Sequence, residues 1–162
     1  MIELSESAFV RALAEFSDHK LRYDAMIPNS WVTPHHEADM LAIRPSGIID
    51  EFEVKLSKAD FLADRKKQIT FDKSSDDNFK LVELENGRTV INNFWYVIPK
   101  GLVDHALVPD FAGLIEISNK VEVIKHPTRL HSRKADYRTR YELVRKLSNR
   151  FWGLDAKNQN NL

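Results

Sequence analysis

The stretch EADMLAIRPSGIIDEFEVKLSKADFLADRKK, residues 37–67, decides the fold. Residues 39–44 and 48–56 are expected strands, and Pro45-Ser46-Gly47 between them is a turn signal in which glycine can supply a positive φ. Ser57 then caps a helix, and the aspartate three positions later completes a capping box. The pattern predicts a β-hairpin that leads directly into a helix.

The second strand of this hairpin separates apolar from charged side chains. Period 2 gives one face Phe52, Val54 and Leu56, and the other face Glu51, Glu53 and Lys55. The Cβ atoms of Glu53 and Lys55 are expected roughly 6–7 Å apart on that face. If the two strands pair antiparallel around the turn, Asp39 falls near Lys55 and within reach of Glu53. Two carboxylates and one ammonium then converge on one patch.

This convergence suits phosphodiester chemistry. Two carboxylates favour a hard cation such as Mg²⁺, which takes its remaining ligands from water and phosphate. The ammonium of Lys55 can hold a phosphate oxygen or orient an attacking water. The alternative is that Glu53 and Lys55 form the solvated face of an edge strand and that Asp39 simply begins a strand.

A longer run of residues carries a resemblance to a known family. It comprises Glu37-Ala38-Asp39, Phe52-Glu53-Val54-Lys55, Ser57 to Phe61, Asp64 to Lys67, FWYVIP at 94–99 and AGLI at 112–115. In this order it resembles the PD-(D/E)xK nuclease superfamily, in particular its MmcB-like branch of DNA-repair and phage-borne nucleases. One departure is Ala38, where the superfamily pattern has proline. That proline is structural, so the chemistry of the acids and the lysine is unaffected.

The resemblance implies an α/β protein with a restriction-endonuclease-like core, in which helices flank a mixed central sheet. It implies a Mg²⁺- or Mn²⁺-dependent nuclease that hydrolyses DNA, in repair or in phage DNA processing. Asp39 and Glu53, with the Val54 carbonyl, are the implied metal ligands, and Lys55 is the third catalytic residue. The candidate supporting residues are Glu6, Glu37, Lys66 and Gln68. For Glu6 the alternative is a simple role at the positive end of a helix dipole. A non-catalytic nucleic-acid-binding module on the same fold, or an unrelated protein-binding α/β domain, are the alternatives to the enzyme.

Composition and charge bound these expectations. The 162 residues suit one domain, residues 1–154, followed by a polar tail, residues 155–162, that is expected to be disordered. Cysteine is absent, no apolar run approaches the length of a membrane span, and the N-terminus is acidic. These features predict a cytoplasmic protein without membrane association.

The net charge of zero hides an uneven distribution. From Lys125 onward there are ten Lys or Arg against three Asp or Glu, which leaves the rest of the chain acidic. A basic end suggests that one face grips a polyanion, and a solvated basic helix is the alternative. DNA is the expected partner, for a monomer or a homodimer. The candidate DNA-binding residues are Arg133, Lys134, Arg138, Arg145, Lys146 and Arg150.

The remaining elements follow from periodicity. Residues 5–17 predict an amphipathic helix, and residues 93–99 predict a buried strand. Asn86-Gly87 within residues 80–91 predicts an inserted β-hairpin, and residues 113–124 predict another hairpin. A final helix is expected over residues 133–152, with Gly153 ending it. The residues expected to face the core from this helix are Tyr137, Tyr141, Val144, Leu147 and Phe151.

Overall fold

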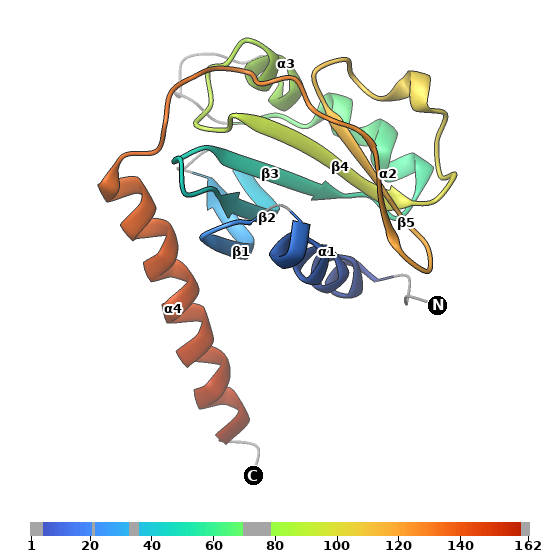
Figure 1. The fold of residues 1–162 in the computed structure, drawn as a ribbon. Coiled ribbons are helices and arrows are strands. Elements are labelled where there is room, and N and C mark those ends of the chain that lie inside the picture. The colour runs from blue at the N-terminus through green and yellow to red at the C-terminus, as the bar shows by residue number, and fades with distance from the viewer. Residues whose placement is uncertain (1–4, 21, 33–35, 70–78, 160–162) are drawn as a thin grey trace.

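The structure, a computed structural model, describes residues 5–20, 22–32, 36–69 and 79–159 (Figure 1). The described residues form an α/β protein with a six-stranded, mixed, open sheet. Its strands follow chain order and are β1 (Ala25–Val32), β2 (His36–Ile43), β3 (Ile49–Val54), β4 (Asn93–Pro99), β5 (Gly113–Ile117) and β6 (Val121–Lys125). The pairs β3–β4 and β4–β5 are parallel, and the other pairs are antiparallel.

Helices cover both faces of the sheet (Figure 1). They are α1 (Glu6–Lys20), α2 (Lys58–Ala63) with the 3₁₀ turn η1 (Asp64–Lys66), α3 (Lys80–Glu85), the 3₁₀ turn η2 (His105–Leu107) and α4 (Tyr137–Gln159). On one face, Phe9 and Leu13 of α1 belong to a core that includes Phe52. On the other, Phe61 of α2 and Leu84 of α3 pack in a second core. None of the helices in these described ranges has the length and apolar run that crossing a membrane requires.

The predicted hairpin and helix of residues 37–67 are confirmed. β2 pairs antiparallel with β3, with Met40 opposite Phe52. The Ser57 hydroxyl accepts a hydrogen bond from the Asp60 amide at 3.1 Å, which caps α2. The separation of faces also holds, but β3 lies in the middle of the sheet and both of its faces are buried. The charged face is therefore an interior face rather than a solvated edge.

The inserted hairpin predicted over residues 80–91 is wrong, because residues 80–85 form the helix α3. The Asn86-Gly87 signal is used differently: Gly87 has φ +63° and its amide bonds the Leu84 carbonyl, as at a helix C-terminus. A glycine with positive φ serves both a hairpin turn and a helix end, so the dipeptide alone did not distinguish them. The helical form turns Lys80 and Leu84 toward the sheet, where both are fully buried.

The face of α4 that meets the body also differs from the prediction. Leu147 packs against the core, as predicted. Leu143, which was not among the predicted residues, is buried in it. The other residues expected to face the core are exposed, namely Tyr137, Tyr141, Val144 and Phe151. The helix projects from the sheet, so its aromatic stripe has no neighbouring element to pack on (Figure 1). It also continues through Gly153 to Gln159, into the stretch that was expected to be a disordered tail.

Candidate active site

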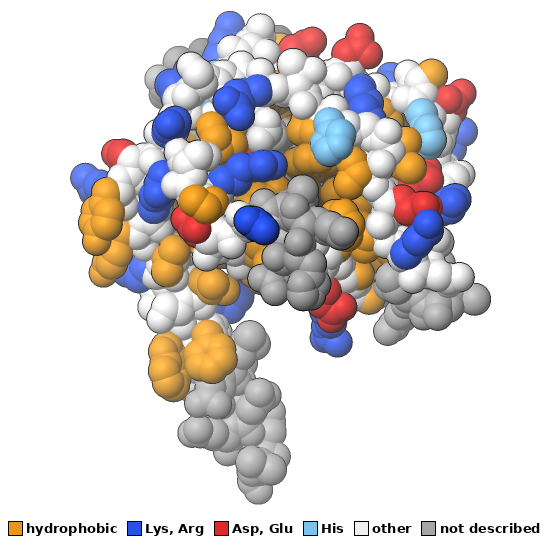
Figure 2. All heavy atoms as spheres, viewed as in Figure 1, with side chains coloured by type: hydrophobic (Ala, Val, Ile, Leu, Met, Phe, Trp, Pro, Cys, Tyr) orange, Lys and Arg blue, Asp and Glu red, His pale blue; other side chains and the backbone are white. Residues whose placement is uncertain are grey.

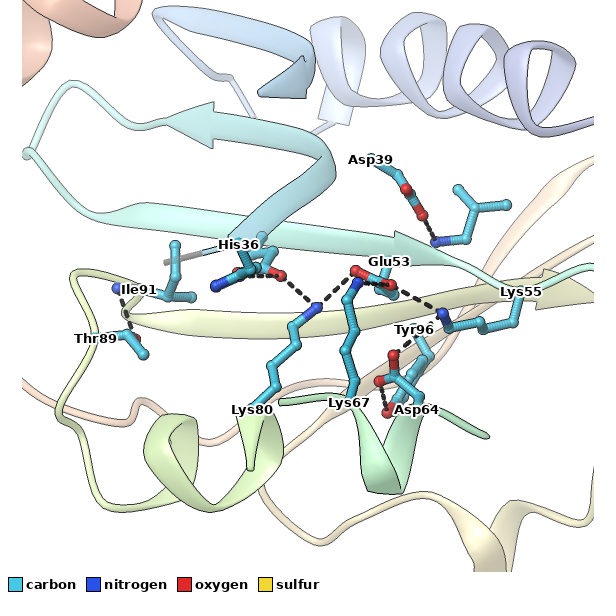
Figure 3. Close-up of polar contacts among 12 residues, drawn as sticks. His36, Asp39, Glu53, Lys55, Asp64, Lys67, Lys80, Thr89, Ile91 and Tyr96 are labelled. Carbon is cyan, nitrogen blue, oxygen red and sulfur yellow. Dashed lines mark hydrogen bonds and ion pairs between the residues drawn. The ribbon is translucent and has the colours of Figure 1, made fainter. Parts of the chain in front are cut away.

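Asp39 is held at the point where β2 separates from β3. The pairing of these strands ends at Met40 and Phe52, so the Val54 amide has no partner carbonyl on β2. Asp39 Oδ2 accepts a hydrogen bond from that amide at 2.6 Å (Figure 3). A buried amide needs such an acceptor, and the bond fixes the Asp39 carboxylate beside the end of β3.

Glu53 lies one residue before Val54 and is surrounded by three ammonium groups. Its Oε1 is 2.8 Å from Lys55 Nζ and 2.9 Å from Lys67 Nζ, and its Oε2 is 2.6 Å from Lys80 Nζ. Figure 3 shows these lysines converging on the carboxylate from the end of β3, from the segment after η1 and from α3. Glu53 is 1% exposed, so the carboxylate depends on these partners for its charge.

Lys55 joins Glu53 to a second acid. Its Nζ is 3.1 Å from Asp64 Oδ1 in η1 and 3.6 Å from Asp60 Oδ1 in α2. Asp64 Oδ2 in turn accepts a hydrogen bond from the Tyr96 hydroxyl at 2.7 Å. The cap at Ser57 turns the chain back into α2 directly after β3. The helix and the 3₁₀ turn that follows it therefore place the carboxylates of Asp60 and Asp64 beside Lys55 at the end of β3.

Lys80 extends the network along β3. Its Nζ lies 2.8 Å from Glu51 Oε1, and Glu51 Oε2 is 2.9 Å from His36 Nε2. Lys80 also lies 5.0 Å from the centroid of the Phe94 ring. Lys80 and Glu51 are completely buried and His36 nearly so, so the interior face of β3 carries an ordered array of opposite charges.

The two acids of the predicted catalytic set have opposite electrostatic environments. Burial alone would raise the pKa of Glu53, but Lys80, Lys55 and Lys67 together hold it far below its ordinary value. Burial, followed by the negative charge of Glu53, raises the pKa of Asp39 from 3.8 to about 6. Its bond to the Val54 amide opposes this rise. Glu53 is thus an anion at neutral pH, whereas the carboxylate of Asp39 takes up its proton near pH 6.

An open hollow of about 400 Å³ lies beside Asp39. Its described lining consists of Glu6, Asn29, Glu37, Asp39 and Lys67. Lys67 therefore faces the hollow while its ammonium contacts Glu53, and its side chain is 35% exposed. The hollow therefore exposes Asp39 to solvent, whereas Glu53 is not among its described lining residues and contacts it through Lys67.

The oxygen-rich lining suits a hard divalent cation. A bound cation would also relieve the repulsion between the Asp39 and Glu53 carboxylates. Within the described ranges, no three His, Asp or Glu side chains are arranged as a ready-made metal site. Two carboxylates with a backbone carbonyl and water are a sufficient set for Mg²⁺. Of the predicted ligands, Asp39 is the one that lines the described hollow, and Glu53 lies behind it, paired with lysines.

Comparison with known proteins identifies the fold alone. Neither a family model nor a curated protein matches the chain. A solved structure, the SPO1766 protein of unknown function from Silicibacter pomeroyi, is similar with a TM-score of 0.64 and 18% sequence identity. The match covers 94% of this chain and 90% of that one. The similarity therefore extends over most of the chain, and at this identity it shows a common fold alone.

Of the four predicted supporting residues, two lie at the site and two do not. Glu6 and Glu37 line the hollow with Asp39, and the charge of Glu6 contributes to the raised pKa of Asp39. Lys66 and Gln68 are exposed and are not among the residues that line the hollow. The residue between them reaches Glu53 instead, because η1 ends at Lys66 and the chain then turns extended.

The six basic residues predicted to bind DNA do not form one surface in the structure. Arg133 donates hydrogen bonds to the Gly87 and Thr89 carbonyls and so anchors the segment before α4. Arg138 is exposed and pairs with Glu142 at 3.1 Å. Lys146 and Arg150 line a groove between α4 and β1. Lys134 and Arg145 are exposed elsewhere.

Sequence reasoning missed most of the partners that hold the predicted triad. They are His36, Glu51, Asp64, Lys67, Lys80 and Tyr96. Glu51 was detectable, since it shares the strand face of Glu53. Asp64 and Lys67 belong to the run that carries the family resemblance, but nothing in the sequence pointed to their contacts with Lys55 and Glu53, and Lys80 required α3 to be identified as a helix.

Proposed function

We propose that this chain is a Mg²⁺- or Mn²⁺-dependent deoxyribonuclease on a restriction-endonuclease-like core, of the kind used in DNA repair or phage DNA processing. One observation supports this most directly. Asp39, Glu53 and Lys55, which the sequence predicted as a set, are grouped at the end of β3 beside an open hollow. The order of the strands, with an antiparallel hairpin followed by a parallel strand, is compatible with that core.

The two acids and the Val54 carbonyl are the proposed ligands of the cation. When bound, a divalent cation lowers the pKa of a coordinated water and neutralises charge that develops on the phosphate. Asp39 is held in place for this role by its bond to the Val54 amide, and Glu53 by its three lysines. Both carboxylates are thus positioned before substrate arrives, as electrostatic catalysis requires.

Lys55 acts as a cation rather than as a base. Burial would lower its pKa, but the charges of Glu53 and Asp64 outweigh burial and raise the pKa above its ordinary value. The ammonium therefore keeps its proton at neutral pH, and it can donate to an attacking water or to a phosphate oxygen but cannot accept a proton. Asp64 and Tyr96 fix the direction in which it points.

A second function has support from one feature, the saturation of Glu53 by ammonium groups. A carboxylate so fully paired resembles a structural network, and the protein would then be a non-catalytic nucleic-acid-binding module. Such a module would bind DNA equally with and without a divalent cation and would leave the phosphodiester bonds intact.

The deciding experiment incubates end-labelled single- and double-stranded DNA and RNA with Mn²⁺ and the wild-type protein, Asp39→Asn or Asp110→Asn. Asp110 is exposed between β4 and β5, so the last variant repeats the chemical change away from the site. We expect DNA cleavage by the wild type and Asp110→Asn and none by Asp39→Asn. Cleavage by all three proteins would remove Asp39 from the chemistry, and cleavage by none, with DNA bound, would support the binding module.

A further inference from the structure

A groove between α4 and β1 shares one lining residue with the hollow at Asp39. The groove has a volume of about 210 Å³ and is lined by Ile27, Pro28, Asn29, Ser30, Lys146 and Arg150. Asn29 lines both the groove and the hollow. The β1–β2 register places Pro28 opposite Met40 and Ser30 opposite Ala38, so Asn29 lies opposite Asp39. Asn29, which lines both depressions, and Asp39, which lines the hollow, are therefore neighbours on adjacent strands.

The charges along this path change sign. At the α4 end they are the basic Lys146 and Arg150, which lie one helical turn apart. One guanidinium nitrogen of Arg150 donates to the Pro28 carbonyl, which holds its positive charge at the wall of the groove. At the other end the hollow has Glu6, Glu37 and Asp39 against the single cation Lys67 among its described lining. A phosphate is attracted to the first end and is repelled at the second unless a divalent cation is bound there.

The dimensions favour one strand of a polyanion rather than a compact ligand. Sites for drug-sized ligands enclose about 300–1,000 Å³, and this groove is smaller and shallow, with Asn29 shared between it and the hollow. Asn29 has φ +44°, a conformation that few residues other than glycine, asparagine and aspartate adopt readily. Its exposed amide can donate to a phosphate oxygen at the junction without adding charge.

We propose that the α4–β1 groove binds one phosphate backbone of the DNA substrate and leads it past Asn29 to Asp39. Lys146 and Arg150 contact successive phosphates, and Asn29 contacts the phosphate that precedes the hollow. The proposal rests on the proposed function for the identity of the polyanion. It adds the path of the substrate and selects two of the six predicted basic residues as the ones that carry it.

The same helix offers a matched control. Arg138 and Arg145 are exposed and do not line the groove, and neighbouring residues on a helix project about 100° apart. Figure 2 shows basic and hydrophobic side chains along the outer surface of the projecting helix. A double charge reversal there changes the net charge by the same amount as one in the groove but leaves the path intact.

The test measures DNA binding by fluorescence anisotropy in EDTA, so that nothing is cut, over a range of KCl concentrations. We expect Lys146→Glu with Arg150→Glu to reduce the slope of log K against log[salt] by about 2, and Arg138→Glu with Arg145→Glu to leave it nearly unchanged. Asn29→Asp should weaken binding about 5-fold, from one added charge near a phosphate. Asn119→Asp, in the β5–β6 turn, should have no effect. Thermal melts confirm that each variant is folded.

Equal effects of the two double reversals, or of the two Asn→Asp changes, would overturn the groove proposal. So would a dimer in sedimentation that Lys146→Glu with Arg150→Glu dissociates, because a second copy of the chain would then cover the groove. The outcomes also separate the two proposals. If the wild type cuts DNA and the groove variants bind normally, the nuclease proposal is supported and the groove proposal is wrong. If nothing is cut and the groove variants bind DNA weakly, the groove proposal is supported and the nuclease proposal is wrong.

Discussion

Asp39→Asn is expected to make the protein more stable while abolishing the proposed DNA cleavage. Burial and the charge of Glu53 raise the pKa of Asp39 from 3.8 to about 6. Between roughly pH 4 and pH 6 the native protein keeps a proton that the unfolded chain has lost. The native state then binds more protons, so the free energy of unfolding falls as the pH rises through this window and is level above it. Asparagine removes the charge and keeps an oxygen that can accept from the Val54 amide.

The size of the effect follows from the shift. Two pKa units correspond to about 3 kcal/mol at full strength. The Asp39 side chain is partly exposed, and solvent screening reduces such values, so we expect about 1–2 kcal/mol. For a chain of this length that raises the Tm by roughly 2–8 °C. The gain should be complete near pH 7.5, smaller at pH 5 and absent near pH 4.

Urea denaturation of the wild type, Asp39→Asn and the surface control Asp110→Asn at these three pH values measures the difference. A second series with Mn²⁺ should reverse the order, because a cation bound to the native state at 100 times its Kd adds about 2.7 kcal/mol to the wild type alone. If Asp39→Asn were no more stable than the wild type at pH 7.5, or if the difference did not depend on pH, the electrostatic account of the site would be refuted.

Three lysine substitutions test the rest of the site. Lys80→Met leaves two buried carboxylates without their shared partner and should cost about 3–5 kcal/mol of unfolding free energy in urea denaturation, whereas Lys100→Met at the surface should change nothing measurable. Lys67→Ala removes the one partly exposed ammonium from Glu53 and should tighten Mn²⁺ binding about 2–5-fold in calorimetry, with Lys66→Ala unchanged. Lys55→Ala should lower the rate of DNA cleavage by about 10²–10³. Because Lys55 is buried between two acids, it should also lower the Tm, which a partly exposed strand residue would not.

The hairpin and the strand faces were predictable because period 2 and the turn chemistry are local properties of the sequence. The same local information led to the wrong structure for residues 80–85, where alternating apolar and polar side chains suit a strand as well as a short helix. What decides between them is nonlocal: the helix places the Lys80 ammonium between Glu51 and Glu53, and a strand does not. The partners of a buried charge are therefore the part of a site that periodicity alone does not identify.

A similar limit applies to α4. A stripe of aromatic residues at helical spacing predicts a core-facing surface only if another element lies opposite it. In the structure the body meets α4 through Leu143 and Leu147, and the stripe that contains Tyr137 and Tyr141 faces outward. The periodicity was correct as a property of the helix, but the angle at which the helix leaves the sheet is set by the segment before it. Asn92 fixes that segment by donating to the His131 and Arg133 carbonyls.

The burial of Glu53 argues against the alternative in which Glu53 and Lys55 are simply the solvated face of an edge strand. On a solvated edge strand, an acid and a lysine two residues apart are common and need no function. Here β3 is central, and Glu53 is 1% exposed. Desolvating several charges is expensive even when they are paired, and apolar residues of similar size often stabilise a protein more. This network lies next to a second acid, Asp39, whose pKa burial and the charge of Glu53 raise to about 6, at the edge of an open hollow. The two acids therefore differ in charge state at mildly acidic pH, as the proposed function requires of them. Of the three lysines that the described structure places on Glu53, Lys67 is the one that also lines the hollow, so a ligand in the hollow contacts the Glu53 network through this ammonium.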